Sequence, residues 1–278
     1  MRTLIIDAGS TKTEWIVLNE GRVEDRFTTR GYNPNYADTH ILTSLLYQES
    51  PKSLSNLDAV HYYGSGCGSD ENKRSIELQL SSRFKEAQRI TVTHDLMAVC
   101  HAVLGHQKGI ACILGTGANS CLYNGTEITD QAVSLGYLVG DEGSGCYIGR
   151  KLTRAYFYNM MPLELKLSFD IDYHLEIKDF INNVYTKPEA SKYLASFTKF
   201  AGKHQDHPFI KQMVKECFSD FIQVFVLRYN DCRSMPISFV GSVAYFFQTL
   251  LSESLEAEGL HLGTVRQTPA EGLIRYYS

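Results

Sequence analysis

The sequence predicts an α/β fold made of two related lobes. Strand-like and helix-like segments alternate over the first third of the chain, which favours a mixed sheet flanked by helices. A hairpin with a turn of small residues occurs twice, near residues 4–15 and again at residues 109–128. With 278 residues the chain is also long enough for two compact domains. The repeated hairpin therefore indicates two lobes that each present such a turn to a shared cleft.

Composition excludes several classes of protein. The net charge is -4 and no block of basic residues occurs, so we expect no nucleic-acid partner. No stretch of about 20 apolar residues could cross a membrane, and the apolar start is ended by Asp7 before it could form a signal peptide. We therefore expect a cytoplasmic protein. Its seven cysteines form no C-x-x-C pair, which argues against a disulfide framework or a zinc ribbon.

Three strands joined by tight turns are predicted for residues 3–28, with turns at residues 8–12 and 19–21. Beyond them, apolar residues either recur at helical spacing or form short runs typical of buried strands. These segments are a helix at 38–50, a strand at 57–63, a helix at 70–87, a strand at 90–93 and an apolar helical stretch at 96–104.

The second hairpin repeats the first. A strand at 110–114 is followed by the turn Gly115-Thr116-Gly117, a strand at 120–123 and a hairpin signal at Asn124-Gly125. Asp7 aligns with Gly115 of this copy, and Gly9 aligns with Gly117. Glycine turns can aim backbone N–H groups at phosphate oxygens, although either turn alone is more often a plain connector. The pair favours a nucleotide triphosphate held between the lobes.

A further glycine lies where a strand at 237–240 gives way to an apolar helical segment. Gly241 and Ser242 stand at this junction. Glycine at such a place lets a flat ligand approach the start of the helix, but it equally allows close packing of strand and helix. The sequence leaves both interpretations open.

Four motifs occur in one order along the chain: "DAGSTKTEW" at 7–15, "THD" at 93–95, "GTGANS" at 115–120 and "GYLVGDEGSGCYIGR" at 136–150. Together they resemble the BadF/BadG/BcrA/BcrD ATPase family, in its N-acetylglucosamine kinase-like branch. That family belongs to the actin, hexokinase and Hsp70 superfamily. The resemblance covers nearly the whole chain, and the G-D-E-G-S block is its most specific part.

The resemblance implies a two-lobe, actin-like ATPase fold with duplicated ribonuclease H-like domains, a mixed five-stranded sheet in each lobe, and the ATP and sugar sites in the interlobe cleft. The N-terminal lobe is expected at residues 1–105, with a C-terminal helix at 266–278 that packs back on it. The C-terminal lobe is expected at 106–265, including a helical insertion over 173–229.

The resemblance also assigns the nucleotide site. Asp7 would orient the Mg²⁺ of the nucleotide through water, in keeping with a hard cation that takes one or two carboxylates and retains several waters. From the residues alone, Lys12 could equally be a solvated surface charge. The expected ATP and phosphate contacts are Gly9, Ser10, Thr11, Lys12, Gly115, Thr116, Gly117, Gly241 and Ser242.

The resemblance assigns a sugar site as well. Asp95 would accept the proton of the reacting sugar hydroxyl, whereas its position before an apolar helix is more typical of an N-cap. Asn35 is likewise more typical of a turn than of a ligand site. The residues expected to contact the sugar are Asn33, Asn35, Asp95, Asn119, Gly136, Asp141 and Glu142.

The resemblance thus implies an ATP- and Mg²⁺-dependent kinase that phosphorylates the 6-hydroxyl of an N-acetylated amino sugar, either N-acetylglucosamine or N-acetylmuramic acid. One alternative is the ATPase activator of a radical dehydratase, which holds an iron–sulfur cluster on cysteines between protomers. The other is a non-catalytic sugar sensor, against which the intact Asp95 argues. Small molecules, the sugar and ATP, are the expected partners; whether the protein is a monomer or a homodimer stays open.

Overall fold

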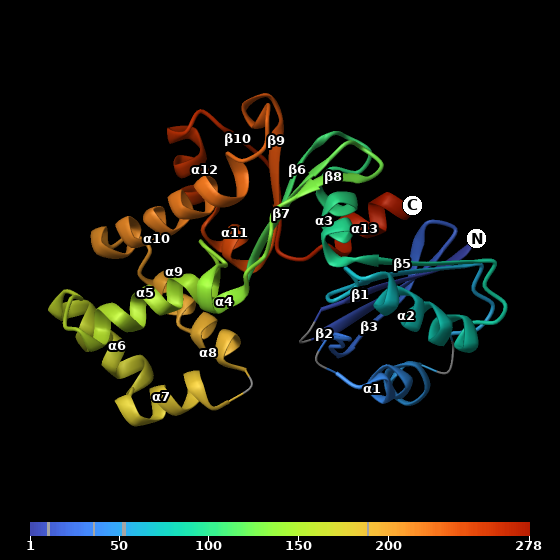
Figure 1. Cartoon of the computed structure of the whole chain (residues 1–278), viewed down its shortest axis with the longest axis horizontal. Helices are drawn as coiled ribbons and strands as arrows, with labels where there is room; N and C mark the ends of the chain where they lie inside the picture. The colour runs from blue at the N-terminus through green and yellow to red at the C-terminus, as the bar shows by residue number, and fades with distance from the viewer. Residues whose placement is uncertain (10–11, 36, 52–53, 188) are drawn as a thin grey trace. The chain divides into compact units, whose positions relative to one another are not determined.

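The computed structural model (Figure 1) describes residues 1–9, 12–35, 37–51, 54–187 and 189–278. They form two compact units. Unit 1 comprises Met1–His106 with Pro269–Ser278, and unit 2 comprises Gln107–Thr268. Each unit contains one mixed five-stranded sheet with helices, so the predicted α/β class and its pair of sheets are confirmed.

The sheet of unit 1 has the strand order β3-β2-β1-β4-β5. Its first three strands are antiparallel because short turns join them, while β4 and β5 run parallel to β1 because helices precede them. The middle of β1 is fully buried at Leu4, Ile5 and Ile6. The strands are β1 (Arg2–Ala8), β2 (Lys12–Asn19), β3 (Arg22–Arg30), β4 (Ala59–Gly64) and β5 (Arg89–His94).

In the described part of unit 1, four helices and a wider helical turn at Leu45–Glu49 accompany the sheet: α1 (Thr39–Ser44), α2 (Asp70–Arg83), α3 (Asp95–Val103) and α13 (Ala270–Tyr277). The closing helix α13 packs along α3 (Figure 1). The contact requires glycine, because a Cβ on Gly272 would lie 2.2 Å from the carbonyl oxygen of Ala102. The expected helix over 266–278 begins only at Ala270, since Arg266 ends a strand of unit 2.

An aromatic cluster also attaches α13 to the rest of unit 1. The Tyr63 hydroxyl on β4 lies 2.5 Å from the Tyr277 hydroxyl and 2.7 Å from Nδ1 of His101. The His101 ring stacks on Tyr276 with 3.9 Å between centroids. Burial lowers the pKa of His101 to about 4, so the imidazole is neutral near pH 7. The last turn of the chain thereby holds α3, the helix that begins with Asp95.

The sheet of unit 2 repeats this plan, with the order β10-β9-β6-β7-β8. Again three strands form an antiparallel meander, and two later strands lie parallel to the first of them. The strands are β6 (Gly109–Leu114), β7 (Ala118–Tyr123), β8 (Ile128–Gln131), β9 (Pro236–Val240) and β10 (His261–Arg266). The sequence pattern did not predict β10, which occupies the position that β5 has in unit 1.

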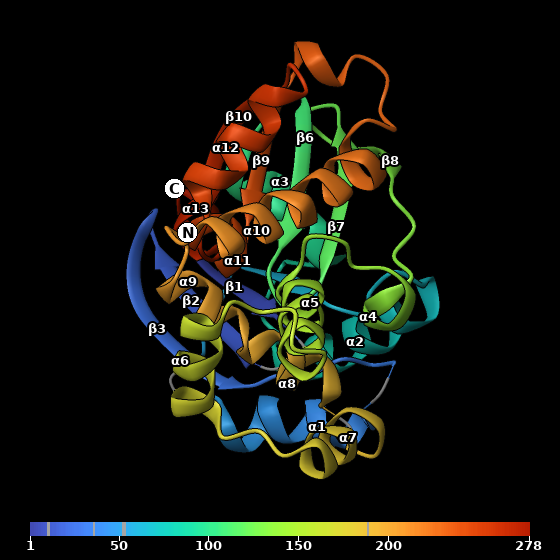
Figure 2. The ribbon, with the colours of Figure 1, turned by 90° about the vertical axis from the view of Figure 1, so that its left-hand side faces the viewer.

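Most of the described part of unit 2 outside the sheet is helical. The helix α5 crosses α8 closely (Figure 2), because Gly149 has no Cβ; a Cβ there would lie 1.9 Å from the carbonyl oxygen of Leu194. No helix in the described part of the chain is long and apolar enough to cross a membrane. The helices are α4 (Gly136–Val139), α5 (Gly145–Phe157), α6 (Leu163–Tyr173), α7 (Ile177–Tyr185), α8 (Ala190–Ser196), α9 (Thr198–Lys203), α10 (Pro208–Phe221), α11 (Ser242–Phe246) and α12 (Gln248–Ala257).

Candidate functional site

The first hairpin of unit 1 places Asp7 near the end of β1, directly opposite Glu14 of β2. Beyond it the chain turns tightly: the Gly9 N–H donates to the Lys12 carbonyl at 3.0 Å, and the Gly9 carbonyl accepts from the Tyr32 N–H at 3.2 Å. Two of the expected phosphate contacts, Ser10 and Thr11, lie outside the described residues. The described part of the turn is thus fixed by backbone hydrogen bonds on both sides of Gly9.

Asp7 has an unusual electrostatic environment. The pKa of its carboxyl group is raised to about 7, chiefly by burial and in addition by the carboxylates of Glu14 and Asp95, against the opposing effect of the Lys12 ammonium. Glu14 is buried and paired with Arg26, whose Nε lies 2.5 Å from Oε1. The Lys12 side chain is 57% exposed and its Nζ is 3.8 Å from Glu14, so it remains accessible. This end of β1 therefore concentrates negative charge.

Such a site fits Mg²⁺ in the form that nucleotides carry it. Within the described ranges no group of three or more His, Cys, Asp or Glu side chains could hold a metal ion by itself. Mg²⁺ bound to phosphates, however, needs only one or two carboxylates together with water. A cation beside Asp7 would also relieve the repulsion that raises the pKa of this group.

Asp95 is the first residue of α3, and the N-cap position belongs to His94. The Leu96 N–H donates to Oδ1 of Asp95 at 3.0 Å, and the Ser65 hydroxyl donates to Oδ2 at 3.0 Å. Asp95 therefore does not act as the N-cap that its position suggested. Its carboxylate is instead held at the start of the helix by donors from two different elements.

The loop before α1 contains the two predicted asparagines. Oδ1 of Asn33 accepts the Asn35 N–H at 3.0 Å, as in an Asx turn, and the Asn33 carbonyl accepts the Ala37 N–H. Oδ1 of Asn35 accepts from Nδ2 of Asn72 on α2 at 2.9 Å. Both side chains thus stabilise the loop, while Asn35 also remains exposed.

In unit 2 the second hairpin turn is bonded to the start of α5. The Gly115 N–H donates to the Gly117 carbonyl at 3.0 Å, which closes the turn. The N–H groups of Gly145 and Cys146 then donate to the carbonyls of Gly115 and Thr116, at 2.8 and 3.1 Å. Two motifs separated in sequence, G-T-G and G-D-E-G-S-G, are thereby joined.

Asp141 lies against this turn. It has a left-handed backbone with φ of 56°, is buried, and accepts a hydrogen bond from the Ala118 N–H. A Cβ on Gly117 would be 3.0 Å from Oδ2 of Asp141, so glycine leaves room for the carboxylate. Burial raises the pKa of Asp141 and outweighs the Ala118 hydrogen bond. Glu142, beside it, is half-buried.

Arg150 is a residue that sequence reasoning missed. Its guanidinium donates to the carbonyls of Leu138 and Gly140, at 2.9 and 3.2 Å, and so fixes the segment that begins at Gly136 and ends at Asp141. Gly136 itself has a φ of 72°, which favours glycine. The signal was the position of Arg150 as the last residue of the motif "GYLVGDEGSGCYIGR" at 136–150.

Asn119 is the amide that was expected to contact the sugar. It lies on β7 opposite Ile113, and its Oδ1 accepts the N–H of the next residue, Ser120, at 2.8 Å. The side chain is half-buried. Its amide nitrogen is a donor that this bond does not use.

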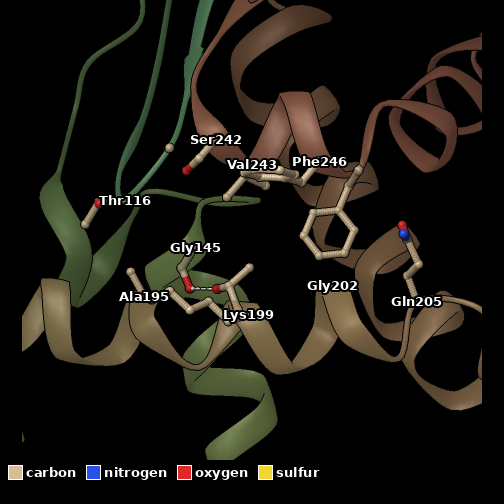
Figure 3. A pocket seen from close by; sticks show the side chains of 12 residues that line it. Thr116, Gly145, Ala195, Lys199, Gly202, Gln205, Ser242, Val243 and Phe246 are labelled. Carbon is tan, nitrogen blue, oxygen red and sulfur yellow. Dashed lines mark hydrogen bonds between the residues drawn. The ribbon is translucent and has the colours of Figure 1, made fainter. Parts of the chain in front are cut away.

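A pocket of about 460 Å³ opens in unit 2 beside the hairpin turn. Figure 3 shows Thr116 and Ser242 toward one end of it and Gln205 toward the other, with the Phe246 ring nearer to Gln205. The hydroxyl of Thr198 donates to the Gly145 carbonyl at 2.7 Å beneath the pocket. The lining residues are Gly115, Thr116, Gly145, Ala195, Thr198, Lys199, Gly202, Gln205, Ser242, Val243, Phe246 and Phe247.

The structure supplies the packing reason for Gly241. Its φ is 140°, and a Cβ would lie 2.3 Å from the Leu114 carbonyl oxygen, so close packing of β9 on β6 requires glycine whether or not a ligand binds. The next residue, Ser242, lines the pocket. The opposite wall of the pocket is formed by residues of α8 and α9. The sequence showed no motif in these segments.

No family model matches the chain. Its structure is similar to that of a "putative N-acetylglucosamine kinase" from Porphyromonas gingivalis, with 40% identity, a TM-score of 0.93, and coverage of 99% of this chain and 98% of that chain. The chain belongs to the N-acetylglucosamine kinase-like proteins. These proteins have the actin-like ATPase fold predicted from the motifs.

Two more distant similarities accompany this match. A curated N-acetylmuramic acid/N-acetylglucosamine kinase from Clostridium acetobutylicum is 28% identical over 153 residues. The match takes in 53% of this chain and spans about half the length of that relative, 50%. A ROK family glucokinase from Streptomyces griseus, solved with glucose and AMPPNP, shares the fold, with a TM-score of 0.57 at 14% identity over 100% of this chain and 98% of that chain.

The raised pKa of Asp7 predicts how stability depends on pH. Between the ordinary aspartate pKa of 3.8 and about 7, the folded protein binds a proton that the unfolded chain does not, so the free energy of unfolding falls as pH rises through this window. Asp7→Asn removes the buried charge. In the ligand-free, metal-free protein it should raise the free energy of unfolding by on the order of 1 kcal/mol near pH 8, with a smaller gain at lower pH.

Urea unfolding at several pH values measures this difference. Asp25→Asn, which removes an exposed carboxylate from strand β3 of the same sheet, is the matched control for loss of negative charge. An Asp7→Asn protein that is less stable than the wild type near pH 8 would contradict the assigned environment of Asp7.

Proposed function

We propose that this chain is an ATP-dependent sugar kinase that transfers the γ-phosphoryl group to the 6-hydroxyl of N-acetylglucosamine or N-acetylmuramic acid. Within the actin-like superfamily we place it in the BadF/BadG/BcrA/BcrD family, on the motifs at 7–15, 93–95, 115–120 and 136–150. The names of the Porphyromonas and Clostridium relatives support an amino-sugar substrate.

The pocket of unit 2 is the observation that carries the proposal. It combines a polar glycine turn at one end with apolar and aromatic side chains at the other, which suits the two ends of a nucleotide. Phe246 is 59% exposed and lines the pocket, so its ring is available to contact a base. Thr116 and Ser242 offer hydroxyl groups to the phosphates, and in unit 1 Lys12 would offer a positive charge.

Asp7 would hold Mg²⁺ through water, and the bound ion would supply neutralisation of the phosphate charge. The chain's own contribution is chiefly positioning, because phosphoryl transfer needs little covalent chemistry from the protein. Asp95, at the start of α3, would accept a hydrogen bond from the sugar hydroxyl and take its proton as transfer proceeds.

The sugar itself would be held by amide and carboxylate groups. Asn33 and Asn35 lie on one loop of unit 1, and Asn119, Asp141 and Glu142 belong to unit 2. Carboxylates suit sugar hydroxyls because charged acceptors make the stronger hydrogen bonds. We assign the N-acetyl group to the surroundings of Asn119, whose amide nitrogen can donate to a carbonyl oxygen.

The cysteines favour this function over the iron–sulfur activator. All seven are buried, and burial raises the pKa of Cys67, Cys146 and Cys217 to about 12. Cluster ligands shared between protomers must be thiolates at a protein surface. Neither Cys100 on α3 nor Cys112 on β6, both without exposed area, meets that requirement.

A substrate panel tests the proposal. Glucose, N-acetylglucosamine, N-acetylmuramic acid and N-acetylmannosamine are incubated with ATP and Mg²⁺, and nucleoside diphosphate release is measured. At least one N-acetyl sugar with the gluco configuration should exceed glucose by tenfold or more in kcat/KM, on the order expected when buried polar groups lose their partner. The matched control is 6-deoxy-N-acetylglucosamine, which should inhibit without being phosphorylated. Equal turnover of glucose would contradict the amino-sugar assignment, and absence of transfer to every sugar would contradict the kinase.

Two substitutions of Gly202 test whether the pocket of unit 2 binds the nucleotide. A Cβ there would lie 3.8 Å from Cζ of Phe247, an ordinary contact, so Gly202→Ala should fold and bind ATP nearly as the wild type does. Helix propensity should even favour alanine by up to about 1 kcal/mol. Gly202→Val adds two methyl groups inside the pocket and should weaken binding of a non-hydrolysable ATP analogue at least about tenfold, the loss expected from a misfit of this size.

Calorimetry with the ATP analogue and with the sugar, on both variants, gives the comparison. Sugar binding should be the same in all three proteins. Wild-type nucleotide affinity in Gly202→Val would mean that ATP binds elsewhere.

A further inference from the structure

The loop Gly64-Ser65-Gly66-Cys67-Gly68-Ser69 joins β4 to α2 and has no role in the function proposed so far. Within it, Ser65 makes two contacts. Its hydroxyl donates to Oδ2 of Asp95 at 3.0 Å, and its N–H donates to the carbonyl of Ala8 at 2.9 Å. Ser65 therefore connects the carboxylate at the start of α3 to the end of β1, one residue beyond Asp7.

We propose that Ser65 is a positioning residue that fixes the orientation of the Asp95 carboxylate for the reacting hydroxyl. The inference rests on the proposed function of Asp95. An ionised carboxylate has about four acceptor positions on two oxygens. The Leu96 N–H occupies one position on Oδ1, and the Ser65 hydroxyl occupies one on Oδ2. With one donor on each oxygen, rotation of the group is restricted while acceptor positions remain for a substrate.

The loop holds Ser65 in place because its glycines allow close contacts. A Cβ on Gly64 would lie 2.4 Å from the Tyr62 ring and 2.8 Å from Sγ of Cys67. Gly66 has a φ of 80°, and a Cβ there would be 2.3 Å from Oδ1 of Asn33. Side chains at either position would collide with these neighbours of the loop.

The same loop is attached to the asparagines assigned to the sugar. Nδ2 of Asn72, in the first turn of α2, donates to the Gly66 carbonyl at 2.8 Å and to Oδ1 of Asn35 at 2.9 Å. Ser65 is thus part of one hydrogen-bonded frame that includes Asp95 and the loop of Asn33 and Asn35. The Ser65 hydroxyl fixes the Asp95 carboxylate without adding charge. A lysine or arginine at this position would add a positive charge.

The test is a double-mutant cycle with Ser65→Ala, Asp95→Ala and the double variant, measured in two ways. In urea unfolding, the two substitutions should be coupled by about tenfold in the unfolding equilibrium constant, as expected for a hydrogen bond to a charged group. In phosphoryl transfer, Ser65→Ala should lower kcat about ten- to hundredfold, the loss expected from misorientation of a reacting group. The KM for ATP should stay within about twofold, and Ser65→Ala should have no further effect once Asp95 is alanine.

Two more variants separate positioning from a structural role. Ser65→Thr keeps the hydroxyl and should restore most of kcat. Ser69→Ala removes a serine from the same loop, the N-cap of α2, whose Oγ accepts the Asn72 N–H at 3.2 Å. It should lower the unfolding midpoint, as loss of a cap does, and should show no coupling to Asp95→Ala.

The inference is overturned if Ser65→Ala and Asp95→Ala are additive in unfolding, or if Ser65→Ala retains the wild-type kcat in an active enzyme. A wild-type protein that phosphorylates no sugar would instead contradict the proposed function. The unfolding cycle would then still decide whether Ser65 holds Asp95.

Discussion

The candidate site of unit 2 depends on two backbone hydrogen bonds, those from the N–H groups of Gly145 and Cys146 to the carbonyls of Gly115 and Thr116. The first N–H groups of a helix have no partner within the helix, so the hairpin turn satisfies donors of α5 while α5 fixes the turn. Gly145 permits this approach, because a Cβ there would already be 3.2 Å from the Gly115 oxygen.

Other features of unit 2 follow from that junction. The chain that leads into α5 passes Gly117 so closely that the Asp141 carboxylate accepts the Ala118 N–H. The Thr198 hydroxyl on α9 bonds to the carbonyl of Gly145, which places α9 as a wall of the pocket. One junction therefore positions a buried carboxylate and a nucleotide-sized pocket. Neither would survive a shift of α5 along its axis.

Unit 1 has the same sheet topology as unit 2, but it brings several carboxylates close together. Its first hairpin brings Asp7 opposite Glu14, and Asp95 is near enough to raise the pKa of Asp7. Such a concentration of carboxylates destabilises the free protein, and it suits a site that receives a cation and a hydroxyl group. The duplicated fold thus supplies acidic groups from one unit and a glycine turn with an apolar pocket from the other.

The sequence predicted both sheets and both hairpins because period-two apolar runs and small-residue turns are local signals. It did not predict β10, whose residues are only partly buried and contain Gly263. It also missed the residues of α8 and α9 that line the pocket, since their role depends on a helix crossing that no motif records. Arg150 and Ser65 act through hydrogen bonds to residues that are not their neighbours in the sequence, and only the three-dimensional structure reveals such bonds. The glycine spacing around Ser65 was nevertheless a signal that could have been followed.

The central claim is that Asp95 accepts the proton of the sugar hydroxyl, and single-turnover transfer by Asp95→Asn tests it most directly. Asparagine keeps the size of the side chain and an oxygen that can accept from Ser65, but it removes the negative charge. The account predicts a folded variant with nearly unchanged nucleotide binding and a transfer step slowed by roughly 10²-fold or more, the usual range for loss of an acid–base group. Transfer at the wild-type rate in a preparation with the wild-type melting temperature would contradict it.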